Sequence, residues 1–317
     1  MVRHFTDLFD LTSDDARTLL RKSAELKRQH AEGVRAPLLP GRTLGMVFEK
    51  PSLRTRVSFQ AAIGQLGGSA IFLRDQDVGM GSRETTADFA RVISQYVDAL
   101  ALRTYAHATV EEIARHASVP VVNALSDVAH PCQAMADMVT VQQAFGGLEG
   151  LSLVFVGDGN NVARSLALAS GLLGVQFALA APPGYEFPED FRAAFRKKFP
   201  DLPLVVDHDP KNALIHADVV YTDVWASMGQ EHEAEDRRRA FLPFQVNLDL
   251  MAHARPHARF LHCLPAHRGD EVTADVLDGP RSLVIEQAAN RLHFQKALLI
   301  WLVLGAWPEE LGGASRT

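Results

Sequence analysis

The chain contains very little cysteine. Its 317 residues include two, Cys132 and Cys263, which are too few for a disulfide framework. Free thiols are typical of proteins that work in a reducing compartment. The cysteine content therefore predicts a cytoplasmic protein.

Long hydrophobic runs are also missing. The longest, from Ala297 to Leu304, is too short to span a bilayer. At the N-terminus, charges within residues 1–7 stand where a signal peptide requires an apolar core. We therefore expect no membrane partner and no secretion signal.

The chain also has no excess of basic residues. The formal net charge is -6 and no long basic run occurs, which argues against nucleic acid as the main partner. The 47% hydrophobic and 22% charged residues are typical of a globular protein. At 317 residues the chain has room for two domains.

The most informative stretch runs from Phe48 to Phe59. A buried strand over residues 44–48 leads into it, and apolar residues at helical spacing from Phe59 to Leu66 follow. Pro51 and Ser52 lie at the junction, where helix starts favour proline and a hydroxyl cap. The pattern predicts a strand, a tight turn and a helix.

The first turn of that helix has the parts of an anion site. It combines unsatisfied backbone N–H groups with the hydroxyls of Ser52 and Thr55 and the guanidinium of Arg54. The alternative is a capped surface helix with solvated arginines. We favour a phosphate at this position.

Strands and helices alternate along the rest of the chain. Strand, helix and strand at this spacing predict parallel βαβ units, and so an α/β fold. The expected strands cover residues 44–48, 70–73, 99–102, 119–123, 151–156, 175–179, 204–206, 219–222 and 260–262. Between them, residues 75–83 read as a mobile loop, and the charged run 231–239 as a solvated face.

Polar side chains follow several of these strands. Arg103 ends one strand, and His130 precedes a helix whose first turn holds Gln133. The carboxyl edge of a parallel sheet is where α/β proteins bind ligands. Arg103 or His130 alone would be interpreted as structural. Together with the anion site they place three polar groups at one edge of the sheet, which favours a binding site.

A glycine-rich segment, 145–150, is the best candidate for a domain boundary. The strand after it leads to Gly157-Asp158-Gly159-Asn160-Asn161, which resembles a dinucleotide fingerprint. The third glycine of that fingerprint would fall at Val162, so the motif is not satisfied. This weakens a dinucleotide-dependent oxidoreductase as an alternative.

Five motifs, each at the end of a strand, resemble those of one family. They are similar to motifs of the ornithine carbamoyltransferases, in the aspartate/ornithine carbamoyltransferase superfamily. Any one of them is weak, but five in the family's order are strong. The motifs are Ser52-Leu53-Arg54-Thr55-Arg56, Arg103-Thr104-Tyr105, His130-Pro131-Cys132-Gln133, Asp223-Val224-Trp225-Ala226-Ser227-Met228-Gly229 and His262-Cys263-Leu264-Pro265.

The resemblance implies two α/β domains, each a parallel sheet flanked by helices, with the active site in the inter-domain cleft. The expected carbamoyl-phosphate domain covers residues 1–146, completed by a C-terminal helix at about 287–317. Residues 147–286 would bind ornithine. The family also implies a homotrimer or an assembly of trimers.

The resemblance also assigns roles to single residues. Arg54, Arg103, His130 and Cys263 are the expected catalytic residues. The expected contacts of carbamoyl phosphate are Ser52, Leu53 (through its backbone), Arg54, Thr55, Arg103, His130, Gln133, Cys263, Leu264 and Arg291, and those of L-ornithine are Asn161, Asp223, Ser227 and Met228.

The reaction implied is carbamoyl transfer to the δ-amine of L-ornithine, with no metal and no cofactor. One motif departs from the family. Many members have Gln or His at the position of Gly79, where that side chain reaches the phosphate bound by a neighbouring subunit. Glycine cannot make that side-chain contact.

Two other functions stay open as alternatives. A carbamoyltransferase for a modified ornithine or another amine would share most of these motifs. A zinc-binding regulatory protein would use His130, Cys132, His262, Cys263 and His267, but the paired spacing of structural zinc sites is absent.

Overall fold

The computed structural model describes residues 2–79, 83–226 and 231–308. Its contacts divide the chain into two compact units, 1–139 with 289–317 and 140–288. The boundaries fall inside two helices, α6 and α13, so each of these helices contributes to both units. The sequence placed the boundaries at 146/147 and 286/287.

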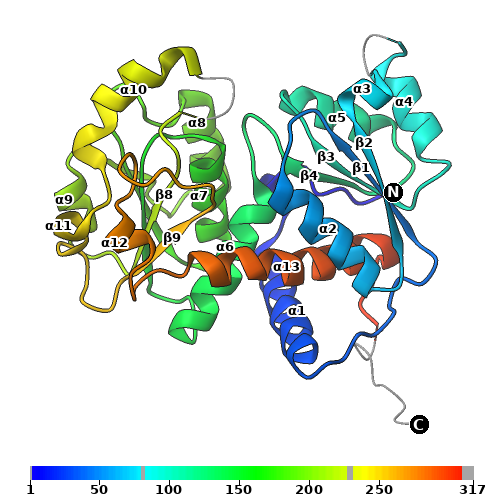
Figure 1. Ribbon diagram of the computed structural model, residues 1–317, viewed down its shortest axis with the longest axis horizontal. Helices are drawn as coiled ribbons and strands as arrows, with labels where there is room; N and C mark the ends of the chain where they lie inside the picture. The colour runs from blue at the N-terminus through cyan, green and yellow to red at the C-terminus, as the bar shows by residue number, and fades with distance from the viewer. Residues whose placement is uncertain (1, 80–82, 227–230, 309–317) are drawn as a thin grey trace. The chain divides into compact units, whose positions relative to one another are not determined.

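The described residues alternate between helices and strands for most of their length (Figure 1). The strands are β1 (Thr43–Phe48), β2 (Ser69–Arg74), β3 (Ala99–Arg103), β4 (Val121–Leu125), β5 (Ser152–Val156), β6 (Gln176–Ala180), β7 (Val205–Asp207), β8 (Val219–Thr222) and β9 (Arg259–His262). The α-helices are α1 (Ser13–Ala31), α2 (Leu53–Gln65), α3 (Asp75–Val78), α4 (Thr86–Ile93), α5 (His107–His116), α6 (Pro131–Phe145), α7 (Asn161–Leu173), α8 (Glu189–Lys198), α9 (Pro210–Leu214), α10 (Ala234–Phe241), α11 (Leu248–Met251), α12 (Ala274–Leu277) and α13 (Val284–Leu304). Short 3-10 helices are η1 (Leu8–Asp10), η2 (Glu231–Glu233) and η3 (Leu242–Phe244).

The first unit is built on a parallel sheet of strand order β2-β1-β3-β4. Because β1 has β2 on one side and β3 on the other, the strand order reverses at β1. Open α/β sheets bind ligands at the carboxyl ends of the strands beside such a reversal. Phe48 and Arg103 are paired at the ends of β1 and β3, which brings the loops after these strands together.

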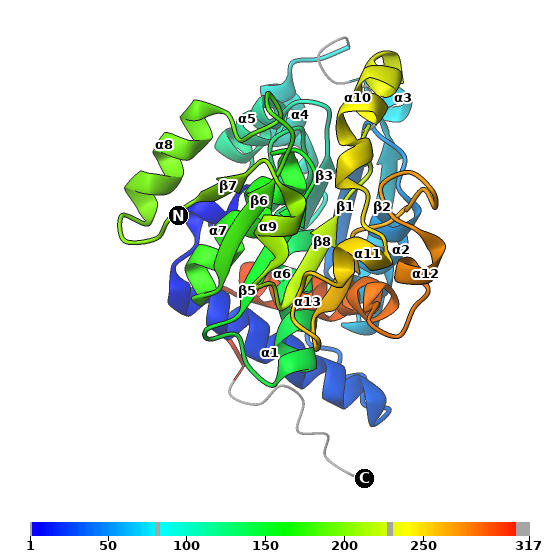
Figure 2. The ribbon, with the colours of Figure 1, turned by 90° about the vertical axis from the view of Figure 1, so that its left-hand side faces the viewer.

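The second unit repeats this plan with the strand order β7-β6-β5-β8-β9, again parallel throughout (Figure 2). The order reverses at β5, so the loops after β5 and β8 are neighbours. An apolar cluster including Val154, Val220 and Phe260 packs these strands against α10 and the segment that follows it. The expected α/β fold with two parallel sheets is confirmed.

Three details of the sequence prediction are wrong. The segment read as a loop from Asp75 contains the one-turn helix α3, while residues 80–82 lie outside the described ranges. In the charged run, Arg237 is buried rather than solvated, because its guanidinium pairs with the Asp158 carboxylate. Strand β4 also begins two residues later than expected, at Val121.

Among the described residues, none of the helices is both long enough and apolar enough to cross a membrane.

Candidate functional site

The start of α2 is a helix N-terminus whose first donors are unused. Ser52 is the N-cap, and its side chain accepts a hydrogen bond from the backbone N–H of Thr55 over 3.3 Å. The N–H groups of Leu53 and Arg54 have no acceptor within the described ranges. The Leu53 side chain points to solvent, with 76% of the residue exposed. An anion here would therefore meet backbone donors and the positive end of a helix dipole.

Arg54 is the cation of this helix start. Its side chain is half-buried, and in the part of the chain that the structure describes it makes no hydrogen bond or ion pair. The next arginine, Arg56, differs, because its guanidinium lies 3.9 Å from the centre of the Phe72 ring. Of these two arginines, Arg54 is therefore the one whose guanidinium is available to a ligand.

Arg103 and His130 follow strands β3 and β4 of the same sheet. Both are buried, Arg103 at the end of β3 and His130 just before α6. Burial lowers the pKa of His130 well below its ordinary value of 6.5, and the charges of Arg291 and Arg103 lower it further. His130 is therefore a neutral imidazole at physiological pH, which can donate a hydrogen bond without carrying charge.

Arg291 connects α13 to this group of residues. Its guanidinium donates to Oγ1 of Thr55 over 2.7 Å and to Oε1 of Gln133. Gln133 in turn donates through Nε2 to Oδ1 of Asp137 over 2.8 Å. All four side chains are buried, so Arg291 is held rigidly between α2 and α6.

We call Ser52, Leu53, Arg54, Thr55, Arg103, His130, Gln133 and Arg291 the anion site. The first unit brings all eight predicted residues to one edge of its sheet. Arg103 and Arg291 are buried cations, and a low-dielectric surrounding strengthens their attraction for an anion. A phosphate with a polar group attached would match the cations, the backbone donors and the neutral imidazole.

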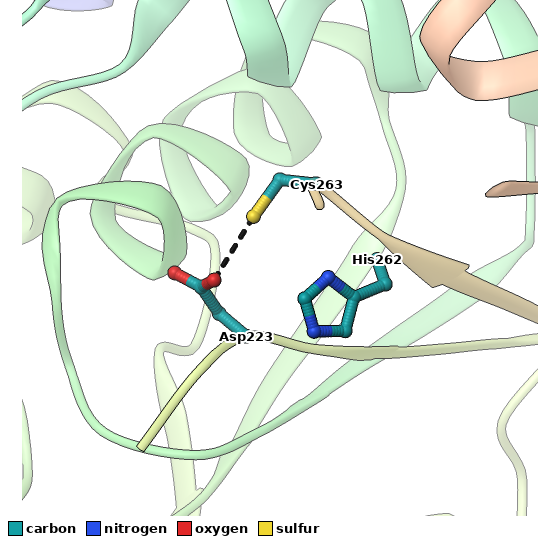
Figure 3. Close-up of side chains that lie close together, drawn as sticks. All are labelled: Asp223, His262 and Cys263. Carbon is teal, nitrogen blue, oxygen red and sulfur yellow. Dashed lines mark hydrogen bonds between the residues drawn. The ribbon is translucent and has the colours of Figure 1, made fainter. Parts of the chain in front are cut away.

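In the second unit, the end of β8 faces the end of β9. The Cys263 thiol donates to Oδ1 of Asp223 over 3.0 Å (Figure 3). The same oxygen accepts the backbone N–H of Val224 over 2.8 Å. Asp223 is only 9% exposed, so a carboxylate and a thiol share a largely buried position. Such a pair can hold an amino group and influence its protonation.

Asn160 contributes the third group at this edge. It caps α7, accepting from the N–H groups of Val162 and Ala163, and its Nδ2 donates to Oδ2 of Asp223 over 3.1 Å. Sequence reasoning selected the neighbouring Asn161, which is the first residue of α7. The cap position was the available signal for Asn160.

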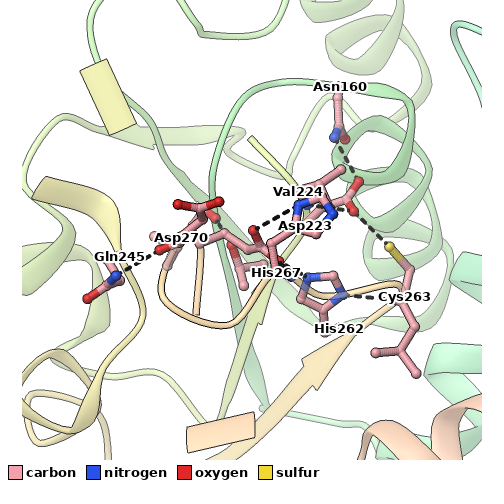
Figure 4. A network of polar contacts seen from close by, with 12 residues as sticks. Asn160, Asp223, Val224, Gln245, His262, Cys263, His267 and Asp270 are labelled. Carbon is pink, nitrogen blue, oxygen red and sulfur yellow. Dashed lines mark hydrogen bonds and ion pairs between the residues drawn. The ribbon is translucent and has the colours of Figure 1, made fainter. Parts of the chain in front are cut away.

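A buried network supports the Cys263 segment (Figure 4). Nδ1 of His262 accepts the N–H of Leu264 over 2.9 Å, so Nε2 carries the proton and donates to Oε1 of Glu271 over 3.1 Å. That same oxygen accepts the N–H of His267. Leu264 has φ 59°, a conformation unfavourable for leucine, which the network maintains. Glu271 was missed by sequence reasoning, because nothing in its motif signals a buried acid.

A buried ion pair holds the segment after β8. The Arg237 guanidinium pairs with Asp158 and donates to the backbone oxygen of Trp225. Burial raises the pKa of Asp158 to about 6, although the charge of Arg237 opposes this. Two other predicted residues, Ser227 and Met228, lie outside the described residues.

The structure offers one possible metal cluster within its described ranges. One ligand atom each from Asp223, His262 and Cys263 lies within 4.8 Å of the others. Both ring nitrogens of His262 are already occupied by Leu264 and Glu271, which leaves no lone pair for a metal. The cluster is better explained as a hydrogen-bonded network.

Family models cover both units. The model described as "Aspartate/ornithine carbamoyltransferase, carbamoyl-P binding domain" matches residues 3–143, and "Aspartate/ornithine carbamoyltransferase, Asp/Orn binding domain" matches residues 149–302. The chain belongs to the aspartate/ornithine carbamoyltransferase family.

Its similar relatives cover nearly all of it. An ornithine carbamoyltransferase of Anoxybacillus flavithermus is 50% identical over 304 residues, 95% of this chain and 96% of that protein. One of Pyrococcus furiosus, described as anabolic, is 51% identical over 94% of this chain and 95% of its own length. A solved structure of ornithine carbamoyltransferase from P. furiosus has a TM-score of 0.92, with 96% of this chain and 98% of that chain covered at 50% identity.

Proposed function

We propose that the protein transfers the carbamoyl group of carbamoyl phosphate to the δ-amine of L-ornithine, giving L-citrulline and phosphate. The observation that carries the proposal is the anion site, with its two buried arginines and neutral histidine beside an open helix N-terminus. The relatives' names supply the substrates, and the anabolic relative favours a role in arginine biosynthesis.

In this proposal the anion site binds carbamoyl phosphate. Ser52, the backbone of Leu53, Arg54 and Thr55 hold the phosphate. Arg103 bridges the phosphate and the carbonyl oxygen, and His130 and Gln133 contact the carbamoyl group. Arg291 has a largely positioning role, because Thr55 and Gln133 already accept its hydrogen bonds.

The second unit binds L-ornithine. Asp223 accepts the α-amino group, aided by Asn161 and by Ser227 and Met228. Cys263 and Leu264 contact the reacting groups, and the thiol helps to set the protonation of the δ-amine. No covalent thioester is needed, because the neutral amine attacks the carbonyl carbon directly.

Catalysis then rests on charge stabilisation and on orientation. Negative charge develops on the carbonyl oxygen and on the departing phosphate. Arg54 donates to the phosphate, His130 to the carbonyl oxygen and Arg103 to both. Holding the two substrates in reacting geometry supplies much of the remaining acceleration. The phosphate itself takes up the proton that the tetrahedral intermediate releases.

A colorimetric assay of ureido products tests the proposal. The purified protein receives carbamoyl phosphate with ornithine, acetylornithine, succinylornithine or putrescine in parallel. We expect ornithine to give the highest kcat/KM by orders of magnitude. A preference for a modified ornithine or for putrescine would overturn the assignment of the amine, and no product with any amine would overturn carbamoyl transfer.

We further propose a homotrimer or an assembly of trimers. Exposed apolar side chains on β2 and α4 support an interface, since Ile71 is 46% and Val92 50% exposed. A pocket of about 440 Å³ between these elements is lined by Leu73, Phe89 and Val92 among others. Three chains of 34.7 kDa give about 104 kDa, which light scattering would detect. A mass near 35 kDa would contradict the proposal.

The loop beside that pocket contains Gly79. Its φ is +64°, and a Cβ would lie 2.7 Å from Cδ of Arg83. A Gln or His at this position would therefore be strained in this conformation. The cytoplasmic location stays a prediction, supported by the two free cysteines.

A further inference from the structure

A group of basic side chains lies where α1, α2 and α13 meet in the first unit. It uses none of the residues of the anion site. Its members surround the last residue of α2, Gln65, whose Oε1 accepts from two of them. The group, which we call the α13 basic cluster, consists of His30, Arg35, His293 and Lys296.

Among the residues that the structure describes, Lys296 is a buried ammonium group without a counterion. The residue is 3% exposed, and its Nζ donates to Oε1 of Gln65 over 3.3 Å. Within the described ranges, its one hydrogen-bond acceptor is this neutral amide oxygen, and no carboxylate acts on its charge. Buried charges in proteins are normally paired, because removing an ion from water is expensive. The position of Lys296 therefore calls for an anion.

His293 provides a second, independent observation. It is 5% exposed, and its Nδ1 has no hydrogen-bond partner among the described residues. Its ring stands edge-on to that of His30, with centroids 5.2 Å apart. A buried polar atom without a partner is rare in native structures and indicates a missing water, ion or ligand.

His30 and Arg35 form the outer part of the cluster. Nδ1 of His30 lies 3.2 Å from Oε1 of Gln65, and its Nε2 lies 3.2 Å from Nη2 of Arg35. Arg35 is exposed, so the cluster is open to solvent on that side. Burial and the surrounding positive groups lower the pKa of His293 to about 3 and that of Lys296 to about 8. The charged neighbours that lower these two pKa values, Arg35 and Lys27 among them, are positive.

We propose that the α13 basic cluster binds a tetrahedral oxyanion, either inorganic phosphate or a phosphate monoester. Lys296 and Arg35 supply two positive charges, and His293 supplies an unused ring nitrogen. An oxyanion with several acceptor oxygens satisfies all three, and charge-assisted hydrogen bonds make such contacts strong. The proposal is independent of the function proposed above.

Equilibrium dialysis with radiolabelled inorganic phosphate at neutral pH tests it. The Arg54→Ala background weakens phosphate binding at the anion site, and the loss caused by Lys296→Met within this background reports the second site. We expect this variant to bind one phosphate per chain, and Lys296→Met within it to weaken binding by about tenfold or more. Competition by phenyl phosphate would identify a site that also accepts monoesters, and competition by sulfate alone would restrict it to free ions.

Control variants and a measurement of stability accompany the phosphate-binding measurement. Lys197→Met, an exposed lysine on α8, should leave the affinity unchanged. Lys296→Met should unfold at the same or higher urea concentration in phosphate-free buffer, because it removes an uncompensated buried charge. Arg35→Met, at the surface, should also weaken binding. Absence of phosphate binding in the Arg54→Ala protein, or equal affinity in the Lys296→Met variant, would overturn the proposal. The proposal would also be overturned if Lys296→Met lowered the mass of the protein in solution, because the partner of Lys296 would then be a carboxylate from a second copy of the chain.

Discussion

Arg54→Ala is the substitution that examines the anion site most specifically. The side chain is half-buried, and within the described ranges no other group contacts it by hydrogen bond or ion pair. Its removal should therefore change the free energy of unfolding by no more than about 0.5 kcal/mol, as at ordinary surface positions. Any large effect on turnover would then come from the lost contact with substrate.

The expected loss follows from the chemistry of the bound phosphate. A donor aimed at charge that develops in the transition state contributes about 2.7–4 kcal/mol, which corresponds to roughly 10²–10³ in kcat. Arg54 would also contact the phosphate in the ground state, so KM for carbamoyl phosphate should rise as well. Inhibition by the product phosphate should weaken in parallel.

Steady-state formation of citrulline, with carbamoyl phosphate varied at saturating ornithine, measures these constants. Arg17→Ala is the matched control, since that side chain is 63% exposed on α1 of the same unit. Urea unfolding of both variants shows whether the fold is intact. Near-normal kcat and KM in Arg54→Ala would refute the assignment of the phosphate to the start of α2.

Three further predictions concern other residues. Iodoacetamide near pH 8 should label Cys263 well before Cys132, because burial raises the pKa of the Cys132 thiol to about 12 and leaves almost no thiolate. Peptide mass spectrometry would measure the rate at each cysteine, and equal rates would contradict the prediction. Glu271→Ala leaves two donors without an acceptor, Nε2 of His262 and the backbone N–H of His267. It should lower the free energy of unfolding by about 1–3 kcal/mol for each donor and should reduce turnover. An unchanged urea midpoint would show that the network is not needed. In phosphate-free buffer, the free energy of unfolding should fall as the pH drops from about 6.5 to about 5. The reason is that the histidine at position 293 binds a proton in this range when the chain is unfolded but not when it is folded, where its pKa is about 3. His293→Gln should make this fall smaller by roughly 2 kcal/mol, and an unchanged fall would exclude a buried neutral His293.

Hydrophobic patterning was sufficient to predict both sheets. Apolar runs such as 44–48 and 151–156 are bounded by glycine, proline and polar residues, and the structure forms β1 and β5 there. Strand boundaries were less accurate. Val119 and Pro120 continue the apolar pattern but precede β4, which begins at Val121, because periodicity does not record where ladder hydrogen bonds begin.

The site was predictable where a residue's role follows from its place in the chain. Arg103 and His130 come directly after strands, and a parallel sheet gathers such positions at one edge. Arg237 was misread because its partner, Asp158, is 79 residues away in sequence. Glu271 was missed because the turn that brings it back to His262, nine residues earlier, has no signal in the hydrophobic pattern. An acid or an arginine in a charged run gives no sign that folding will bury it beside one particular partner.

The stoichiometry of the two products distinguishes carbamoyl transfer from hydrolysis of carbamoyl phosphate. Citrulline and phosphate are measured in the same samples over time, with carbamoyl phosphate and L-ornithine as substrates and with ornithine omitted in a control. Carbamoyl transfer predicts equal amounts of citrulline and enzyme-dependent phosphate at every time point, after subtraction of the phosphate released without enzyme, and no enzyme-dependent phosphate release without ornithine. Enzyme-dependent phosphate release without citrulline would contradict carbamoyl transfer as the function of this protein.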